Sequence, residues 1–259
     1  MYNKTEKILS INNLYSSYSK SLRGMEYILE DLSLDVAPGE CLGIVGESGS
    51  GKTTLINLIA GFMKPIKGKI LFRGQEIQNM GLKERTKKLD CGIQMIFQDP
   101  YSSFHPGQTV GAQLKECLKI TQRISDQEME EKVYKTLLQI GLSKEHYHRY
   151  PHQLSGGQLQ RIGIGCAIIV EPCLLLADEP VSSLDVSVEA QILDLIQELK
   201  QQLGFSSLFI SHDLAVVYYL CDSIAILKNG KIVERGPVKE VFENPQNTYT
   251  KKLIHDSGY

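Results

Sequence analysis

Residues Gly46 to Thr53 read Gly-Glu-Ser-Gly-Ser-Gly-Lys-Thr, which fits the pattern G-x-x-x-x-G-K-[ST]. An apolar, β-favouring run precedes this segment and a helix-compatible apolar run follows it, so the pattern lies between a strand and a helix. The glycines let the backbone turn tightly, and successive N–H groups then point at an anion in front of the positive end of the helix. We therefore expect a phosphate site in which Lys52 reaches the β- and γ-phosphates and Thr53 binds Mg²⁺. The predicted nucleotide-binding residues of this loop are Gly46, Glu47, Ser48, Gly49, Ser50, Gly51, Lys52, Thr53 and Thr54.

Two acidic residues, Asp178 and Glu179, follow a second apolar run, residues 173–177. A carboxylate at the end of a strand can hold Mg²⁺ through water, and a second carboxylate beside it can orient and deprotonate an attacking water molecule. The alternative is an ordinary acidic turn that ends a strand. With a phosphate loop in the same chain, we favour a metal ligand at Asp178 and a general base at Glu179.

A second glycine segment, Leu-Ser-Gly-Gly-Gln at 154–158, precedes a helix predicted for residues 159–170. Its serine hydroxyl and glycine N–H groups predict another anion site at a helix N-terminus, formed by Ser155, Gly156, Gly157 and Gln158. A Ser/Gly turn without function is the alternative. One chain does not need two such sites for one nucleotide, so we expect each segment to cover the nucleotide held by a partner chain.

The elements that must position these residues alternate between strands and helices. Strands are predicted at 8–14, 28–36, 40–45, 69–73, 92–97, 173–177, 206–210 and 223–227, with a hairpin at Asn229-Gly230. Helices are predicted from Lys52 to about Gly61 and at 187–203, and apolar residues at helical spacing mark 109–150 as helical. This order indicates an α/β fold with a mainly parallel sheet. We predict a single domain over 1–259, with a core at 1–100 and 164–259 and a helical insertion at 101–163.

Composition excludes several classes of protein. With 259 residues and a formal net charge of −2, the chain lacks the strongly basic balance of many nucleic-acid binders. No stretch approaches the about 18 uninterrupted apolar residues of a membrane span, and we expect no signal peptide. The six cysteines show no C-x-x-C pairing, which favours buried free thiols in a reducing compartment.

The phosphate loop, the 154–158 segment and Asp178-Glu179, in this order, resemble the nucleotide-binding domain of ATP-binding cassette (ABC) transporters over nearly the whole chain. The resemblance implies a P-loop NTPase (RecA-like) core with an antiparallel β subdomain and an inserted α-helical signature subdomain. It also implies an ATPase in which two subunits enclose two ATP molecules, each between the phosphate loop of one subunit and the signature segment of the other.

Further residues match family positions one by one. Gln98 matches the Q-loop glutamine, which contacts Mg²⁺ or water and signals to membrane subunits, and 182–185 match the D-loop, ending at Asp185. His212 matches the switch histidine that contacts the γ-phosphate. Tyr18 lies where the family places an aromatic ring on adenine, with Tyr15 as a nearby competitor. The resemblance thus implies catalytic roles for Glu179, His212, Gln98 and Lys52, nucleotide contacts from Tyr18 and Asp185, and metal contacts from Thr53, Gln98 and Asp178. The remaining histidines, including His146 and His148, receive no function, and we expect those two on the solvated surface.

Segments 97–106, 150–153 and 230–251 resemble the ATPases of oligopeptide, dipeptide and nickel importers. The end of the chain at Tyr259 favours the shorter nickel- or metallophore-type members. We expect an ATP-hydrolysing importer subunit, bound peripherally at the cytoplasmic face of the cell membrane, that drives uptake of a metal chelate or a di- or oligopeptide. The implied partners are two integral-membrane permease subunits, an extracytoplasmic solute-binding protein and a second ABC ATPase, a paralogue rather than a copy of this chain, with no nucleic acid. An exporter ATPase and a soluble cassette ATPase of DNA repair or translation are the alternatives.

Overall fold

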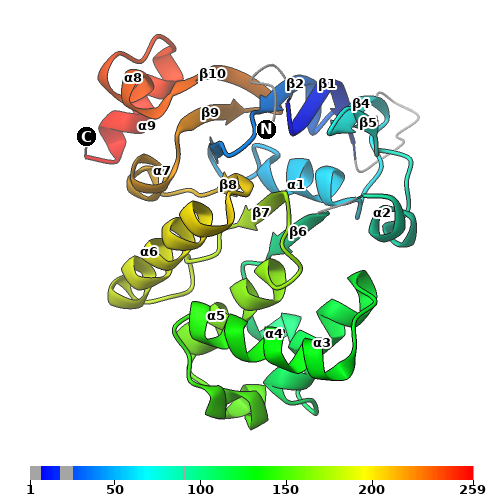
Figure 1. Ribbon diagram of the computed structural model, residues 1–259. Helices are drawn as coiled ribbons and strands as arrows, with labels where there is room; N and C mark the ends of the chain where they lie inside the picture. The colour runs from blue at the N-terminus through cyan, green and yellow to red at the C-terminus, as the bar shows by residue number, and fades with distance from the viewer. Residues whose placement is uncertain (1–6, 18–25, 90–91, 259) are drawn as a thin grey trace. The chain divides into compact units, whose positions relative to one another are not determined.

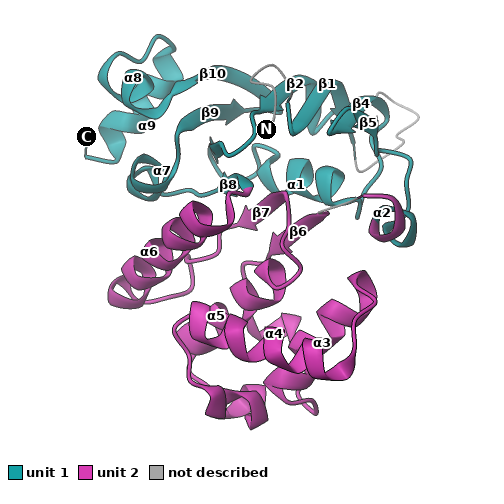
Figure 2. Ribbon diagram, viewed as in Figure 1, with its two compact units in different colours: residues 1–85, 206–259 teal, residues 86–205 magenta. Residues whose placement is uncertain are grey.

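The structure is a computed structural model that describes residues 7–17, 26–89 and 92–258. The chain forms two compact units, shown in two colours in Figure 2. Unit 1 comprises residues 1–85 and 206–259, and unit 2 comprises residues 86–205. The predicted site residues are divided between the two units, and each unit is described by itself.

Unit 1 contains an antiparallel sheet in the strand order β2-β1-β4-β5 (Figure 1). Its strands are β1 (Leu9–Ser16), β2 (Leu29–Val36), β4 (Lys67–Phe72) and β5 (Gln75–Glu76). Apolar residues such as Leu9, Ile11 and Leu14 are buried on β1, while Asn12 and Asn13 between them are exposed. One face of this sheet is therefore packed and the other is open to solvent, as is usual for antiparallel sheets. The predicted antiparallel subdomain is confirmed.

The second sheet of unit 1 has the strand order β10-β9-β3-β8. Its strands are β3 (Cys41–Val45), β8 (Ser206–Ile210), β9 (Ser223–Lys228) and β10 (Lys231–Pro237). Strand β3 is paired in parallel with β8 and β9, and all five of its residues are buried. A continuous apolar run is what a strand covered on both faces requires. The predicted Asn229-Gly230 hairpin joins β9 to β10, and both residues have positive φ (47° and 75°), as a type I′ turn demands.

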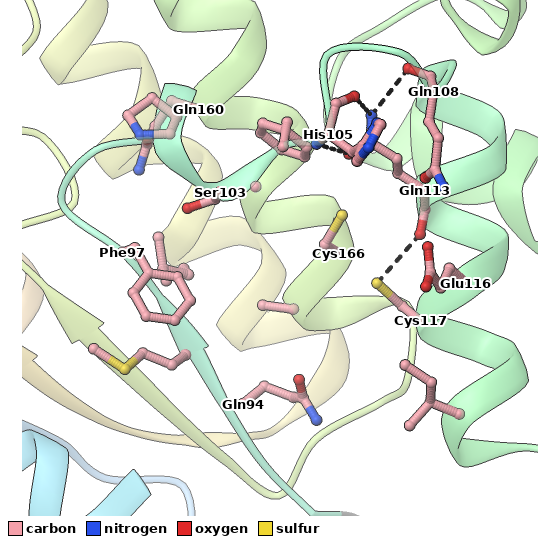
Figure 3. A pocket seen from close by; sticks show the side chains of 17 residues that line it. Gln94, Phe97, Ser103, His105, Gln108, Gln113, Glu116, Cys117, Gln160 and Cys166 are labelled. Carbon is pink, nitrogen blue, oxygen red and sulfur yellow. Dashed lines mark hydrogen bonds between the residues drawn. The ribbon is translucent and has the colours of Figure 1, made fainter. Parts of the chain in front are cut away.

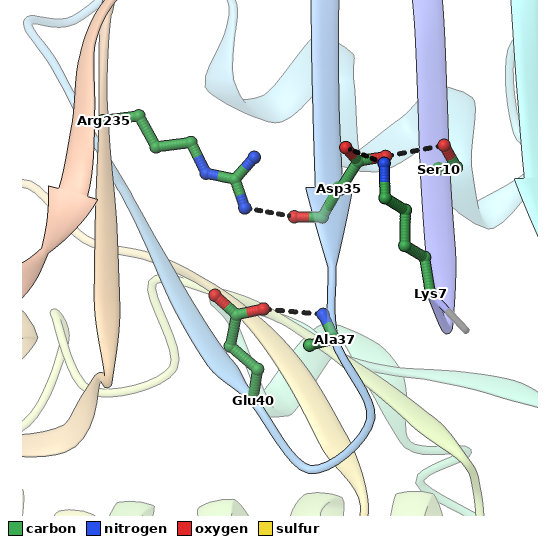
Figure 4. A network of polar contacts seen from close by, with 6 residues as sticks. All are labelled: Lys7, Ser10, Asp35, Ala37, Glu40 and Arg235. Atoms are coloured by element: carbon green, nitrogen blue, oxygen red, sulfur yellow. Dashed lines mark hydrogen bonds and ion pairs between the residues drawn. The ribbon is translucent and has the colours of Figure 1, made fainter. Parts of the chain in front are cut away.

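Polar contacts gather around Asp35, and one of them joins the two sheets of unit 1 (Figure 4). The carboxylate of Asp35 on β2 accepts hydrogen bonds from Lys7 at 2.5 Å and from Ser10 on β1 at 2.6 Å. Arg235 on β10 donates to the backbone oxygen of Asp35 at 2.7 Å. Burial raises the pKa of Asp35, but the two donors outweigh it and hold that pKa below its ordinary value.

Helices complete unit 1, namely α1 (Lys52–Ala60), α7 (Leu214–Leu220), α8 (Val238–Glu243) and α9 (Thr248–Asp256). A further helix, α2 (Leu82–Lys88), spans the boundary at which unit 2 begins, and the sequence did not predict it. Its charged residues give no apolar pattern. Arg85 attaches the helix instead, because its guanidinium donates to the backbone oxygens of Ile59 at 2.5 Å and Ile77 at 2.8 Å.

Unit 2 contains two parallel strands, β6 (Ile93–Ile96) and β7 (Leu174–Asp178). Its helices are α3 (Val110–Thr121), α4 (Asp126–Gln139), α5 (Gly156–Ile168) and α6 (Val186–Leu203), with 3₁₀ turns η1 (Tyr101–Ser103), η2 (Lys144–His148) and η3 (Pro151–Gln153). Helix α5 begins at Gly156 rather than at the predicted Leu159, because Ser155 caps it. The expected burial of the cysteines holds only in part. Cys41 and Cys221 are buried, whereas Cys117, Cys166 and Cys173 are partly exposed. None of the described helices combines the length and apolar character that crossing a bilayer requires.

Candidate functional site

The loop between β3 and α1 depends on glycines for steric reasons. A Cβ atom at Gly46 would lie 2.1 Å from the backbone oxygen of Leu227 on β9, so no side chain fits where the chain leaves β3. Gly51, which precedes α1, has φ 107°, a conformation that is strained for any other residue. The sequence therefore folds into a tight loop against β9 and enters α1 with no side chain at its N-cap.

Lys52 lies inside this loop. Its ammonium nitrogen donates to the backbone oxygens of Gly46 at 2.6 Å and Glu47 at 3.0 Å, and the residue is 7% exposed. The hydroxyl of Ser50 is buried and has no hydrogen-bond partner among the described residues. A buried donor without a partner is costly, and here it lies beside a positive charge and a helix N-terminus. These features fit an anionic group such as a phosphate.

Tyr249 on α9 was not predicted to take part in this site. Its hydroxyl accepts a hydrogen bond from the backbone N–H of Glu47 at 3.2 Å, and the ammonium of Lys228 lies 4.3 Å from the centroid of its ring. Tyr249 is 7% exposed. A segment near the end of the chain thus holds the start of the loop, and only tertiary structure reveals this contact.

His212 and Thr53 lie at the same end of unit 1. Ile210, at the end of β8, is in register with Ile44 of β3, and His212 follows β8 as the loop follows β3. Adjacent parallel strands end at one edge of a sheet, where ligands commonly bind. His212 and Thr53 are both exposed at this edge, while the neighbouring Thr54 is buried.

In unit 2 the structure brings Gln98 and Glu179 into contact. Ile96 of β6 is in register with Ala177 of β7, so both residues follow strand ends at one edge. The amide nitrogen of Gln98 donates to the Glu179 carboxylate and to the Ser182 hydroxyl, each at 3.3 Å. Asp178 ends β7 at 8% exposure. Glu179 has φ 45°, in the left-handed region that few non-glycine residues adopt.

The N-terminus of α5 is closed by its own side chains. The Ser155 hydroxyl accepts a hydrogen bond from the Gln158 backbone N–H at 3.3 Å, and the Gln158 side chain accepts one from the Ser155 backbone N–H at 3.1 Å. This reciprocal pair is a capping box. Ser155 nevertheless remains exposed, so its hydroxyl is open to a further partner.

Gly157 packs against the start of α6. A Cβ atom at Gly157 would lie 2.6 Å from Cγ1 of Val188, whereas one at Gly156 would meet nothing closer than 3.9 Å. Asp185 caps α6 by accepting from the Val188 backbone N–H at 3.0 Å. Hydrogen bonds from the Ser187 hydroxyl and then the Val188 N–H lower the pKa of Asp185, so its carboxylate stays charged. The two predicted nucleotide-contacting helix starts are therefore neighbours within unit 2.

The expectation that His146 lies on the solvated surface is wrong. His146 is 9% exposed, and its Nδ1 lies 2.9 Å from the hydroxyl of Ser143. Its Nε2 lies 3.4 Å from the side-chain nitrogen of Gln158, so the imidazole contacts the 154–158 segment. His148, two residues later, is exposed as expected. The turn η2 directs one histidine inward, and this could not be read from the spacing alone.

Three oxygen donors were predicted to bind a metal, the Thr53 hydroxyl, the Gln98 amide oxygen and the Asp178 carboxylate. Mg²⁺ prefers oxygen ligands of this kind, so each donor taken by itself suits Mg²⁺; Thr53 belongs to unit 1, and Gln98 and Asp178 belong to unit 2. Tyr18, the predicted adenine contact, lies outside the described residues. Its competitor Tyr15 packs edge-on against Tyr27, with ring centroids 5.2 Å apart.

Comparison with known proteins gives a consistent result. A family model described as ABC transporter matches residues 29–182. The chain is 44% identical to the oligopeptide transport ATP-binding protein OppF of Bacillus subtilis (strain 168), over 96% of this chain and 82% of that protein. It is 40% identical to the di/tripeptide transport ATP-binding protein DppF of Pseudomonas aeruginosa (strain UCBPP-PA14), over 96% and 78%.

Solved structures are also similar. The protein cbiO1 from Clostridium perfringens, part of the ABC transporter complex cbiONQ, matches with a TM-score of 0.81 and 27% identity, covering 98% of this chain and all of that one (100%). The dimeric ATP-binding cassette MJ0796 bound to ADP and Pi matches with a TM-score of 0.78 and 27% identity, covering 89% of this chain and 98% of that one. The expected P-loop fold is confirmed.

Proposed function

The chain belongs to the ABC transporter family, and from this premise we propose that it is the ATP-hydrolysing subunit of an importer for short peptides. The hydrolytic role rests on one observation, the hydrogen bond of 3.3 Å from the Gln98 amide nitrogen to the Glu179 carboxylate. The backbone of Glu179 has φ 45°. The relatives at 40% and 44% identity support the peptide class, because both are named as peptide transport ATP-binding proteins. Nickel or a metal chelate remains the alternative cargo.

The roles of the residues follow from their surroundings. Lys52 and the loop N–H groups neutralise the phosphates, Glu179 takes a proton from the attacking water molecule, and Gln98 orients that carboxylate. His212 contacts the γ-phosphate. Thr53, Gln98 and Asp178 would hold Mg²⁺, which would supply positive charge to the phosphate oxygens. Catalysis of phosphoryl transfer consists mainly of such positioning and charge stabilisation.

A second chain completes each site in this proposal. Ser155 and Gly157 of one chain cover the nucleotide that the phosphate loop of the other chain holds, with Asp185 beside them. The similar cassette MJ0796 is dimeric in its post-hydrolysis state with ADP and Pi, which supports the pairing of two chains. ATP then binds two chains together, and the chains separate after hydrolysis, once its products have left. The closing motion would drive two membrane permease subunits, supplied by an extracytoplasmic solute-binding protein, with this chain at the cytoplasmic face of the membrane.

Uptake by cells that lack this chain tests the proposal. The cells are given either a labelled short peptide or labelled nickel, with and without a chelator such as histidine. We expect selective loss of peptide uptake, restored by the wild-type chain and not by the Glu179→Gln variant. Selective loss of nickel uptake would overturn the peptide assignment. Normal uptake of both, with no second ATPase that compensates, would contradict a role in import.

A further inference from the structure

The two ring nitrogens of His146, on the turn η2, meet different partners. Nδ1 lies 2.9 Å from the hydroxyl of Ser143 and 3.2 Å from the backbone oxygen of the same residue. Nε2 lies 3.4 Å from the side-chain nitrogen of Gln158, at the N-terminus of α5. All three residues belong to unit 2, and the imidazole is buried. Each contact therefore restricts which ring nitrogen can carry the proton.

The contact at Nδ1 requires a proton on that nitrogen. A backbone carbonyl oxygen can only accept a hydrogen bond, and the Ser143 oxygen also accepts the backbone N–H of His146 at 3.1 Å. The Ser143 hydroxyl can donate or accept, so it adapts to a proton on Nδ1. Since a neutral imidazole carries one proton, Nε2 of neutral His146 is left as an acceptor.

The contact at Nε2 leads to the same conclusion from the other side of the ring. The side-chain oxygen of Gln158 accepts the backbone N–H of Ser155 at 3.1 Å, which fixes the orientation of the amide group. The amide nitrogen, which can only donate, therefore faces Nε2 of His146. A proton on Nε2 would place two donors against each other. Both ends of the Gln158 amide are thus held, one by Ser155 and the other by His146.

We propose that neutral His146, with its proton on Nδ1, is a positioning residue for the 154–158 segment. It keeps the Gln158 amide in the orientation that engages the Ser155 N–H, and the Ser155 hydroxyl, which accepts the Gln158 backbone N–H, completes the capping box. This box sets the direction in which the exposed Ser155 is presented. The effect on hydrolysis rests on the proposed function, in which this segment covers the nucleotide of a second chain. His146 acts there only through Gln158.

Another histidine of unit 2 provides an internal comparison. His105 lies on the wall of a cavity of about 460 Å³ that is lined by residues of α3, α5, β6 and η1 (Figure 3). Its Nδ1 accepts the backbone N–H of Gly107 at 3.2 Å, so its neutral form carries the proton on Nε2. The structure therefore assigns opposite protonated nitrogens to the two histidines.

The first test locates the proton by ¹⁵N NMR of the full chain, because protonated and unprotonated ring nitrogens give well-separated signals. The spectrum is recorded at about pH 8.5, where an ordinary histidine is neutral. We expect the proton of His146 on Nδ1 and that of His105 mainly on Nε2, with signals assigned from His146→Gln and His105→Gln. A His146 proton on Nε2, or one shared between both nitrogens, would overturn the proposal.

Variants then test the effect on hydrolysis. In His146→Ala the Gln158 amide loses its acceptor, and we expect turnover to fall by about 5-fold, as for loss of one ordinary hydrogen bond, with ATP binding to the isolated chain unchanged. His146→Gln should recover most of the turnover, since its side-chain oxygen can accept in place of Nε2. His148→Ala, an exposed histidine on the same turn, is the control and should match the wild type. Wild-type turnover in His146→Ala would overturn the positioning role.

A double-mutant cycle separates this role from a general loss of stability. If His146 acts through Gln158, then His146→Ala should cause no further loss of turnover in a Gln158→Leu background. Effects that multiply would show a different route and contradict the proposal. Circular dichroism of each variant confirms that the chain is folded. Failure of the proposed function would look different, because the wild type itself would not hydrolyse ATP, whereas the NMR result needs neither nucleotide nor a second chain.

Discussion

Two helix starts in this chain look alike in sequence but are built differently. Helix α1 begins after Gly51, which has φ 107° and gives no side-chain cap. Helix α5 begins after Ser155, whose hydroxyl already engages the Gln158 N–H in a capping box. The first start is left for an anion, with Lys52 beside it, whereas at the second start the Gln158 N–H is already bonded by its own chain and the Ser155 hydroxyl stays exposed. The chain's own affinity for ATP should therefore depend on α1, and α5 should act on the nucleotide of another chain.

Lys52→Ala is expected to have the broadest effect, because it should lower both ATP binding and turnover. It removes the charged donor at the centre of the loop, and loss of one such donor from a phosphoryl-transfer site lowers turnover by about 100-fold or more. ATP binding to the isolated chain should weaken as well, measured by titration calorimetry. Lys87→Ala, an exposed lysine on α2, is the control and should leave both values unchanged. If Lys52→Ala binds ATP as tightly as the wild type does, the chain's own affinity for ATP does not depend on the start of α1.

Ser155→Arg should separate binding from hydrolysis. A bulky cation at this position blocks the approach of a second chain, so we expect hydrolysis to fall by about 100-fold, as for loss of an essential stabilising group, while ATP binding to the isolated chain is unchanged. Ser125→Arg is the matched control, because Ser125 caps α4 with the same kind of capping box. Ser125→Arg should lower the stability of α4 and leave ATP binding and hydrolysis unchanged. A parallel loss of ATP binding in Ser155→Arg would contradict the two-chain arrangement.

Gly157→Ala tests the packing at the start of α5 through the free energy of unfolding. The added Cβ atom would lie 2.6 Å from Val188, and such overpacking lowers the free energy of unfolding by about 1–3 kcal/mol. Gly156→Ala meets nothing closer than 3.9 Å and serves as the control. The double variant Gly157→Ala/Val188→Ala should recover much of the loss in urea unfolding. If it recovers none, the contact with Val188 does not explain why glycine is needed.

Tyr249→Phe gives the smallest effect. It removes the acceptor of the Glu47 N–H and should lower the free energy of unfolding by about 1 kcal/mol, the usual net value of one hydrogen bond. The KM for ATP should rise modestly, because the loop start is held less firmly, while kcat stays close to wild type. An unchanged unfolding curve and KM would show that α9 does not support the loop.

Much of this architecture could be predicted because local patterns and tertiary structure agree. The β3–loop–α1 unit, the Asn229-Gly230 hairpin and the two carboxylates at the end of β7 all carry their signals in adjacent residues. Strand β4 ends at Phe72, one residue before the predicted end, because Arg73 adopts φ 50° at the turn. The prediction of site roles from the sequence remains to be tested by the variants above.

The parts that could not be predicted depend on contacts between distant segments. Arg85 anchors α2 by bonding to carbonyls 8 and 26 residues away, and no apolar period marks that helix. Tyr249 meets Glu47 across 202 residues of sequence. His146 is buried and contacts Gln158, although its neighbours in the sequence are polar. Such residues are polar or aromatic, and only their tertiary partners distinguish them from surface residues.

The most direct test of ATP hydrolysis by this chain is to measure ATP binding and ATP turnover of Glu179→Gln beside the wild type. The substitution keeps the size and the contact of the side chain with Gln98 but removes the carboxylate that accepts the proton of water. We predict wild-type ATP binding together with turnover reduced by about 100-fold to 10,000-fold, the usual contribution of a general base. Near-normal turnover in this variant would remove Glu179 from its catalytic role and contradict the account.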